Sequence, residues 1–304
     1  MDRATSILKM GPFWLLMAVF ALVAALIFFG VRYRDFTVGM DIVPRVMAQK
    51  TAVLSALRIN MIKSVESEKS AVMAATDEAS IAFSEESVRG IEAAEQCLRE
   101  LSQLIEAYPS ETEVKLLREF NECWTGFRSI DQVVLELAVQ NSNLKAARLS
   151  FGAASEAMDL FENALAKLMR DQAAGPICGL ASNALAAGLK INVLHGPHIA
   201  SSDDKEMDGI EKTIQENDAV VRRSLNSLQP LISPDRQATF RQAEAAYNEF
   251  AAVTAKIIEL SQQNTNLKSL ELSLNRKRKM TSQCDEILTS LQDAVQSRSL
   301  KATR

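Results

Sequence analysis

Few residues of this chain have types and spacings that could do chemistry. Its only two histidines, His195 and His198, flank a Gly-Pro pair, and Asp203 and Asp204 follow in a short acidic stretch. Two imidazoles with carboxylates nearby could form a weak transition-metal site. Two ligands on a flexible turn do not fix a coordination geometry, so we interpret this segment as a polar loop that interrupts a helix. We expect neither a metal site nor a bound cofactor.

The cysteines, Cys97, Cys123, Cys178 and Cys284, have spacings that match no zinc-binding pattern. Cys97 precedes Pro109 by 12 residues and Cys123 follows it by 14. If Pro109 lies at the turn of a helical hairpin, these two cysteines are about 3 Å apart along the helix axis. A Cys97–Cys123 disulfide is then possible in an oxidising compartment. Free thiols beside the core are the interpretation that we favour.

Short catalytic motifs are missing from the sequence. It contains no Gly-rich phosphate loop, no H-E-x-x-H, no G-x-S-x-G and no C-x-x-C. We therefore expect a protein that is not an enzyme. The net charge of -4, with both signs interspersed, gives no sign of a nucleic-acid partner. The one dense basic run, 276–279, lacks interleaved aromatic residues and predicts a solvated helix face.

The N-terminal region contains a long apolar stretch, residues 11–31, without a charged side chain. As a helix it would be about 31 Å long, which matches a hydrocarbon core of roughly 30 Å. No small-x-small cleavage site follows, and the stretch is longer than the apolar part of a signal peptide. The sequence therefore predicts a tail at 1–10, a transmembrane helix at 11–31 and a juxtamembrane segment at 32–43. No second apolar stretch of that length is apparent, so we expect a single crossing.

Internal repetition is the most informative feature. Residues 136–150 return as 259–273 with nine of fifteen positions identical, at an offset of 123. Trp124 and its aromatic neighbour Phe127 also have aromatic counterparts 123 positions later, and an earlier match, 57–60 with 189–192, has an offset of 132. Three matches in the same order indicate a duplication.

Each repeat has the composition and periodicity of long amphipathic helices. Gly and Pro are scarce, and apolar residues recur at helical spacing in four segments per repeat. The predicted fold class is all-α, with the single N-terminal transmembrane helix followed by two tandem antiparallel four-helix bundles. The first bundle is expected at 44–174, the second at 175–298, and a C-terminal tail at 299–304.

The repeated segments 141–143 and 264–266, Asn-Ser-Asn and Asn-Thr-Asn, leave one alternative open. We expect turns there, because asparagine caps helices well. The apolar phase runs through both segments without a slip, so a continuous helix of about 60 residues is the other possibility. Under the heptad pattern Asn264 takes a position where Leu is expected. Replacing it with Leu should then leave stability unchanged or raise it.

The stretch from Trp124 to Leu168 combines an aromatic pair, a Leu-Ala step, a small polar turn and an apolar helix. It resembles the last two helices of the four-helix-bundle sensor domain of methyl-accepting chemotaxis receptors. The sequence LRINMIKSVESEKS, residues 57–70, resembles the first helix of that domain. The resemblance covers residues 1 to about 172 and, less closely, 173–297. It implies a body in the periplasm, carried by a helix in the inner membrane of a bacterium.

The resemblance also implies a role and a limit to it. No second membrane helix or signalling coiled coil is recognisable, so a homo-oligomer or a separate membrane signalling partner is expected to provide the output. The Lys/Arg count around the apolar stretch, two before and four after, points instead to a cytoplasmic body. We expect a sensor-like module that binds a ligand or a protein, and the alternative is a structural or accessory scaffold subunit of a membrane complex.

The polar residues that recur in the two repeats are the candidate ligand-binding residues. Their structural interpretation is helix capping or fixing of helix register, and their functional interpretation is a polar pocket between helices. The candidates are Arg58, Asn60, Asn141, Asn143, Lys190, Asn192, Asn264 and Asn266.

Overall fold

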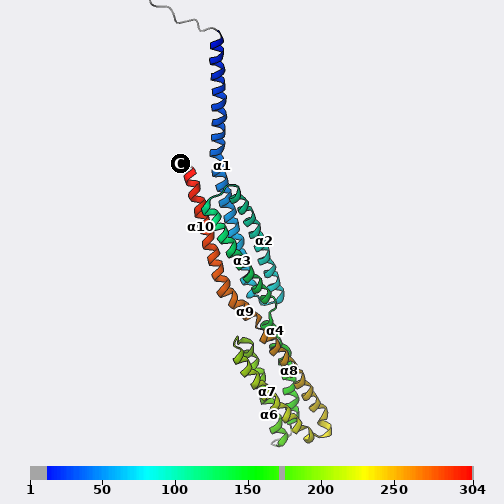
Figure 1. Ribbon diagram of the computed structural model, residues 1–304. Coiled ribbons are helices and arrows are strands. Elements are labelled where there is room, and N and C mark those ends of the chain that lie inside the picture. The colour runs from blue at the N-terminus through cyan, green and yellow to red at the C-terminus, as the bar shows by residue number, and fades with distance from the viewer. Residues whose placement is uncertain (1–11, 171–174, 303–304) are drawn as a thin grey trace, which may run out of the picture. The chain divides into compact units, whose positions relative to one another are not determined.

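The computed structural model describes residues 12–170 and 175–302, with no account of the side chains of 12–16, 18, 29–43 and 300–302 (Figure 1). Almost all of this part of the chain is helical, and no strand occurs in the described ranges. The predicted all-α class is confirmed. The expected N-terminal tail, residues 1–10, lies outside the described residues.

The first three helices are α1 (Pro12–Val72), α2 (Asp77–Ala107) and α3 (Glu111–Ala138). Helix α1 runs without interruption through the predicted transmembrane, juxtamembrane and first bundle segments, and Pro44 lies inside it. No break in the helix therefore marks the predicted boundary at Pro44. A proline removes one backbone hydrogen bond, and the long helix continues past this loss.

The remaining helices follow the repeat. Two of them contain a short π-helical stretch, η1 and η4, and α7 begins with Asp203 accepting hydrogen bonds from the N–H groups of Lys205 and Glu206. Helix α10 continues into the segment 299–304 that was expected to be a tail. The elements are α4 (Ser142–Leu149), η1 (Ser150–Ala154), α5 (Ser155–Met169), α6 (Pro176–Ala200), α7 (Asp204–Leu228), the 3-10 turns η2 (Gln229–Leu231) and η3 (Pro234–Arg236), α8 (Gln237–Gln263), α9 (Thr265–Leu272), η4 (Ser273–Lys277) and α10 (Arg278–Ala302).

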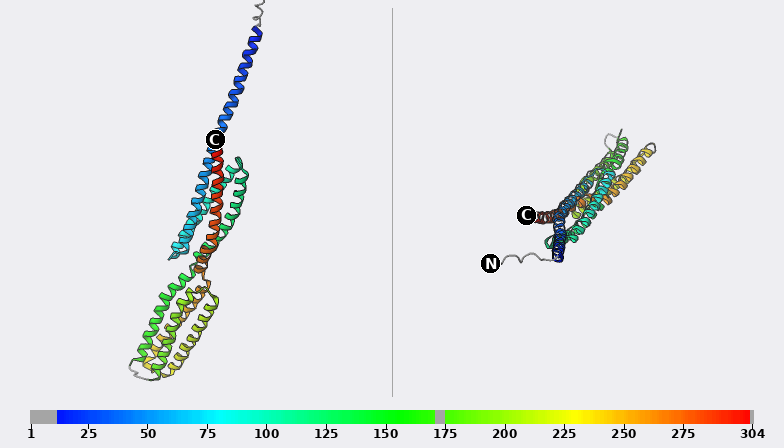
Figure 2. Two further views of the ribbon diagram at one scale, coloured as in Figure 1. Left: turned by 90° about the vertical axis from the view of Figure 1, so that its left-hand side faces the viewer. Right: turned by 90° about the horizontal axis from the view of Figure 1, so that it is seen from above.

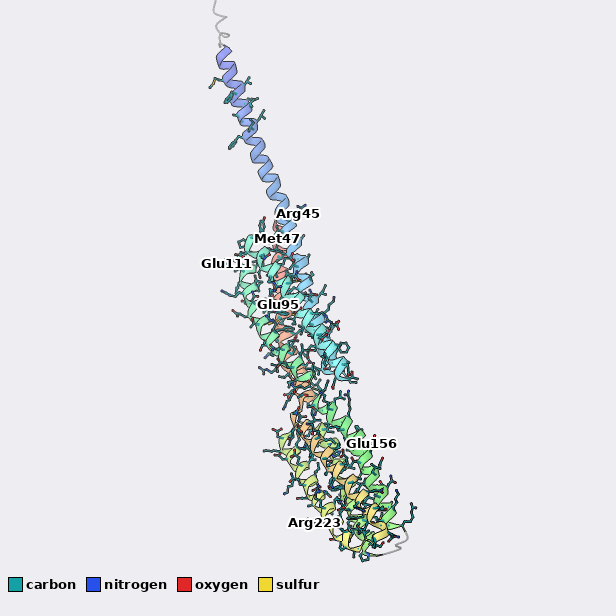
Figure 3. All side chains as sticks on the ribbon, turned by 90° about the vertical axis from the view of Figure 1, so that its right-hand side faces the viewer. Arg45, Met47, Glu95, Glu111, Glu156 and Arg223 are labelled. Carbon is teal, nitrogen blue, oxygen red and sulfur yellow. A yellow bond between two sulfur atoms is a disulfide. The ribbon has the colours of Figure 1, made fainter. Side chains whose placement is uncertain are left out.

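The helices form two compact units. The first comprises the chain up to Met61, Glu92–Cys123 and the chain from Gln283 onward, and the second comprises Ile62–Ile91 and Trp124–Ser282. Each unit therefore takes helices from both sequence repeats. Figure 2 shows the red α10 beside the blue α1, and Figure 3 places Arg45 of α1 at the same end of the first unit as Glu111 of α3.

A buried ion pair closes that end of the first unit. Lys50 of α1 is fully buried, and its Nζ donates to Glu113 Oε2 at 2.6 Å and to the Tyr108 carbonyl at 2.8 Å. Arg298 of α10 adds bonds to the same two residues. Helices α1 and α10 are thereby tied to the turn between α2 and α3.

A disulfide joins Cys123 of α3 to Cys284 of α10, with their Cα atoms 5.7 Å apart. The possible Cys97–Cys123 disulfide is not formed, and the favoured interpretation as free thiols is wrong for Cys123 and Cys284. Cys97 of α2 faces α1, where the Asn60 Nδ2 lies 3.7 Å from its sulfur. Cys97 and Cys178 are both free.

The second unit has a continuous apolar core shared by α5, α6, α7 and α8. Phe161 of α5 and Tyr247 of α8 meet there with ring centroids 5.2 Å apart. Residues 142–169, expected to complete the bundle at 44–174, therefore pack with helices of the other repeat. In the same way, α10 is bonded to α1 and α3 in the first unit. The predicted domains 44–174 and 175–298 do not match this packing, because each repeat contributes its last helix to the other repeat's group.

One helix in the described ranges is long and apolar enough to cross a membrane, and it is α6; a shorter apolar run covers Val19–Phe28. The expectation that no second such stretch exists is therefore wrong. The two segments differ in burial. Helix α6 buries a face that includes Ala184 and Ile191 in the core, whereas Phe20 is 74% exposed. A core helix satisfies the same criteria of length and composition as a membrane span.

The disulfide gives a first test. Replacing Cys284 with Ser should lower the free energy of unfolding of the oxidised protein by about 2–4 kcal/mol, because the bond closes a loop of 161 residues. Chemical denaturation followed by circular dichroism measures the loss, and Cys178→Ser is the control that should change little. A reductant should destabilise the wild type but not the Cys284 variant. Equal stability of the two oxidised proteins would contradict the pairing.

Candidate functional site: a polar clasp and two equivalent grooves

Asn141 and Asn264 interrupt the helices of the two repeats. They are the only non-glycine residues with positive φ in the described ranges, at 51° and 54°. Asparagine tolerates this left-handed conformation better than most residues do. The chain leaves the helix after Ala138 and enters α4 at Ser142, and the second interruption is Asn264 alone, between α8 and α9. The expectation of a break is confirmed, and the continuous helix is excluded.

The two segments that follow, 141–143 and 264–266, bond to each other and are called the clasp here. The Asn143 N–H donates to Asn266 Oδ1 at 3.1 Å, and the Asn266 N–H donates to Asn143 Oδ1 at 3.3 Å. The Ser142 N–H donates to Thr265 Oγ1 at 3.0 Å, and the Thr265 N–H to Ser142 Oγ at 3.1 Å. A helix leaves its first N–H groups without internal partners. Here each helix start is capped by the side chains of the other.

The asparagine side chains extend the clasp. Asn143 Nδ2 donates to Asn264 Oδ1 at 2.8 Å, and Asn266 Nδ2 donates to Asn141 Oδ1 at 3.0 Å. Asn264 Nδ2 also reaches the Ser201 carbonyl, at 2.9 Å. Four of the eight candidate ligand-binding residues are thus brought together, and their polar groups are used to join the repeats.

The other four candidates do not join this cluster. In the first unit, Arg58 pairs with Asp285 (Nε to Oδ1 2.8 Å), and Asn60 faces Cys97. In the second unit, Lys190 is exposed on α6, and Asn192 is half-buried two residues further along.

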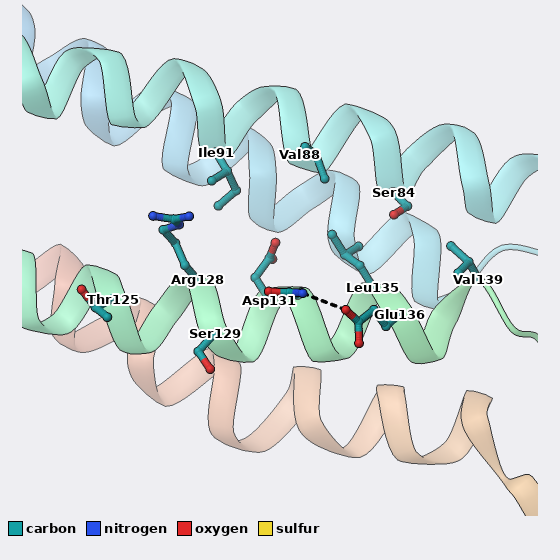
Figure 4. Close-up of a pocket in the computed structure, with 11 residues that line it drawn as sticks. Ser84, Val88, Ile91, Thr125, Arg128, Ser129, Asp131, Leu135, Glu136 and Val139 are labelled. Atoms are coloured by element: carbon teal, nitrogen blue, oxygen red, sulfur yellow. Dashed lines mark hydrogen bonds between the residues drawn. The ribbon is translucent and has the colours of Figure 1, made fainter.

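A groove that the sequence analysis missed lies between α2 and α3 in the second unit, with a volume of about 600 Å³. Ser84, Val88 and Ile91 line it from α2, and Arg128 and Asp131 line it from α3. Figure 4 shows the Arg128 and Asp131 side chains directed toward α2. One wall is therefore largely apolar and the other carries charges. A small molecule with both characters fits such a lining.

Beneath this first groove is a buried ionic cluster. Asp131 is 3% exposed and accepts a hydrogen bond from Lys277 Nζ at the end of η4. The Lys277 ammonium also lies over the Phe127 ring, 3.7 Å from its centroid. Burial raises the pKa of Asp131 and lowers that of Lys277, and their mutual attraction opposes both shifts. The expectation that 276–279 is a solvated face fails at Lys277, which is 1% exposed.

The third member of the cluster is Glu68 of α1, which is fully buried. Neither carboxylate oxygen has a hydrogen-bond partner among the described residues. Ser273 lies close enough to lower the pKa of Glu68, but its hydroxyl does not reach hydrogen-bond geometry. Burial is the larger influence and raises that pKa.

The duplication supplies a second groove, between α7 and α8, with a volume of about 260 Å³. Thr254 and Ala251 line it at the positions that Asp131 and Arg128 take in the first groove, 123 residues earlier. The two grooves are therefore equivalent in the repeat, with the charged side chains of the first replaced by small ones in the second.

Charged residues of α7 line the second groove instead. Tyr247 Oη donates to Asp218 Oδ1 at 2.7 Å, and Arg222 Nε donates to Asp218 Oδ2 at 2.8 Å. The Arg222 guanidinium lies 5.6 Å from the centroid of the Tyr247 ring. Burial, followed by Asp218, raises the pKa of Tyr247 far above its usual value, so the phenol stays neutral and donates.

His195 contacts Thr254, one of the residues that line the second groove. Its Nε2 is 3.1 Å from Thr254 Oγ1, and its Nδ1 is 3.3 Å from Ser150 Oγ in η1. Ser150 and Ser273 are equivalent in the repeat, as are η1 and η4 themselves, 123 positions apart. In both copies, a π-helical stretch meets a buried polar side chain from the helix that opens the repeat. Such π-helical insertions are frequent at functional sites.

The histidines lie inside α6, so the predicted loop at 195–198 is wrong. His195 is fully buried and His198 is 1% exposed, and His198 contacts Ser261 Oγ at 2.6 Å and Glu211 Oε1 at 3.0 Å. Pro197 is exposed and lies in the last turn of α6, where the helix loses the one backbone hydrogen bond that a proline cannot donate. No group of three or more His, Cys, Asp or Glu side chains in the described ranges is placed to hold a metal ion.

No protein-family model matches this sequence, and no curated protein matches it. The geometry of the clasp and of the grooves is therefore the basis of the functional argument.

For the effect of Asn264→Leu on stability, the clasp predicts the opposite of what the heptad pattern predicts. Asn264→Leu should lower the free energy of unfolding by roughly 2–4 kcal/mol, because Leu disfavours positive φ and Asn143 loses an acceptor. Asn264→Gly should cost less, since glycine accepts that φ. Thermal unfolding ranks the variants, with the exposed Gln263→Leu as control. A Leu variant as stable as the wild type would contradict the role given to the clasp.

Because His195 is buried, we expect the protein to lose stability in acid. Burial, followed by the nearby His198, lowers its pKa from 6.5 to about 4. The folded state therefore resists protonation. Neutral His195 contributes up to about 3 kcal/mol to the free energy of unfolding. This contribution is complete above pH 6.5 and is lost as the pH falls to about 4. Denaturant titrations across this window should show a flatter pH dependence for His195→Asn than for the wild type. Parallel curves would refute the assignment.

Proposed function

We propose that this chain is a single-pass membrane protein whose helical body lies outside the cytoplasm and acts as a sensor-like module. The observation that carries the proposal is the first groove, with one apolar wall, one charged wall and a floor that is bonded to a π-helical stretch. A small molecule bound there contacts Asp131, which in turn holds Lys277 of η4. Ligand binding is thereby coupled to the geometry of a helix that continues into α10.

The anchor in this proposal is the apolar stretch 11–31. Of the two apolar segments, only this one exposes all of its described side chains, including Phe20 and Leu26 at 74% and 65%, whereas α6 buries one face. An exposed apolar surface of this extent needs a membrane or a partner to cover it. Helix α6 has its partners within the second unit, so a single crossing remains the proposal.

The Cys123–Cys284 disulfide supports a body outside the cytoplasm. Disulfides persist in oxidising compartments such as the periplasm and are rare in the cytosol. The geometry of this pair therefore agrees with the resemblance to chemoreceptor sensor domains and opposes the Lys/Arg count. We propose the inner membrane of a bacterium as the location.

Association of two copies is also part of the proposal. In the first unit, α1 exposes Ala48, Ala52, Ser55 and Ile59, which follow the heptad spacing of a coiled-coil seam. A parallel pair of these helices would continue from a pair of membrane anchors. A second membrane protein with a matching helix would receive the signal in the same way.

Topology can be tested with reporters fused after Arg304 in the full chain, one active only in the cytoplasm and the other only in the periplasm. The disulfide and the resemblance predict activity of the periplasmic reporter alone. A matched fusion after Lys9 should give the reverse result. Cytoplasmic activity at the C-terminus would reject the proposed orientation.

Ligand binding can be tested by a thermal-shift screen of small polar molecules on the detergent-solubilised protein. A ligand at 100 times its Kd should stabilise the body by about 2.7 kcal/mol. Ser129→Trp fills the first groove and should abolish the shift, whereas the repeat-equivalent Ala252→Trp should retain it. A ligand that stabilises both variants equally binds elsewhere. If a helical partner protein alone stabilises the chain, the scaffold alternative is favoured.

A further inference from the structure

Glu68 is surrounded by a defined set of charged groups. From α3 it faces Asp131, from η4 it faces Lys277, and on its own helix the exposed Lys69 is the adjacent residue. Ser273 is the neutral polar side chain that lowers the pKa of Glu68. Glu68, Asp131 and Lys277 each have less than 4% of their surface exposed, so solvent cannot neutralise a charge left among them.

The charges of the cluster do not balance when every group is ionised. Two carboxylates face one ammonium, and this leaves one negative charge inside the protein. The ammonium is engaged by Asp131 Oδ1 and by the Phe127 ring. Glu68 then remains a buried carboxylate with no hydrogen-bond donor on either oxygen. Burying an unpaired charge is far costlier than burying the neutral acid.

We propose that Glu68 is a proton-binding site: it holds a proton in the folded protein at neutral pH and releases it in alkaline medium. The neutral acid leaves Asp131 and Lys277 as a matched pair and requires no further counter-charge. Loss of the proton places a second carboxylate beside Asp131 and competes for Lys277, the last residue of η4. The helix geometry at η4 is therefore coupled to pH.

The direction of the pKa shift agrees with this geometry. Burial raises the pKa of Glu68, and Ser273 and then Lys277 oppose the rise only in part. The folded state holds the Glu68 proton more tightly than the unfolded chain does. The contribution of this proton to the free energy of unfolding is therefore complete below the pKa that Glu68 has in the unfolded chain. That contribution declines as the pH rises through the pKa that Glu68 has in the folded protein. The effect is opposite in sign to that of His195, which acts in acid.

The experiment uses the full chain in detergent and the variant Glu68→Gln, which resembles the protonated acid in shape and charge. The folding equilibrium constant of the wild type should fall relative to the variant as the pH rises from 5 to 9. The fall should approach tenfold per pH unit where one proton is released. The exposed Glu66→Gln, two residues away on the same helix, is the matched control and should follow the wild type.

Infrared spectroscopy supplies a readout that does not depend on stability. The wild type and Glu66→Gln should show the carbonyl band of a protonated carboxylic acid at pH 7, and Glu68→Gln should lack it. Glu68→Met replaces the Gln variant if that one does not fold. Absence of the band from the wild type, or parallel pH curves for wild type and Glu68→Gln, would overturn the proposal. So would stabilisation of the wild type alone by sodium or potassium chloride over choline chloride, because a metal cation would then take the proton's place.

Discussion

The reciprocal hydrogen bonds between residues 141–143 and 264–266 are the interaction on which the second unit depends. A helix that restarts after a left-handed residue exposes N–H groups that need acceptors. Neither repeat supplies those acceptors for itself. Each supplies them for the other, through Ser142 and Thr265 and through the asparagine side chains. The duplication thus provides each helix start with the side chains that cap it.

The same symmetry places the two grooves and the two π-helical stretches. Because 141–143 pairs with 264–266, the residues that follow them occupy equivalent positions in the two repeats. Ser150 and Ser273, seven residues after Asn143 and Asn266, each begin a π-helical stretch. The two copies have diverged in charge. One has the ionic cluster of Glu68, Asp131 and Lys277, and the other has the neutral pair of His195 and Thr254. One architecture thus presents two sites for which we expect opposite responses to pH.

The sequence was sufficient to predict the helices, the duplication and the breaks at Asn141 and Asn264. These features follow from apolar periodicity, direct repetition and the local preferences of asparagine. The assignment of helices to packed groups was wrong, because the last helix of one repeat and the last helix of the other have similar apolar faces. Nothing in the periodicity distinguishes packing within a repeat from exchange between repeats.

The errors at individual residues share a physical cause. The Gly-Pro pair between the histidines indicated a loop, but both imidazoles are buried and bonded to α8, and the helix continues despite the backbone hydrogen bond that Pro197 cannot donate. The basic run containing Lys277 indicated a solvated face, because its buried counter-charge, Asp131, is 146 residues away in sequence. Cys284 was not considered as a partner of Cys123 for the same reason. Contacts of this kind depend on tertiary packing, and a single sequence does not show them.

Residue-resolved amide hydrogen exchange tests the central claim most directly. The amides of Ser142, Asn143, Thr265 and Asn266 begin helices, where N–H groups normally exchange through local fraying. If the two segments cap each other, these four amides should be protected together, with an opening free energy close to that of global unfolding. The Lys205 and Glu206 amides at the start of α7, capped only locally, should exchange faster. Exchange of the four clasp amides at the rate of the α7 pair would contradict the account.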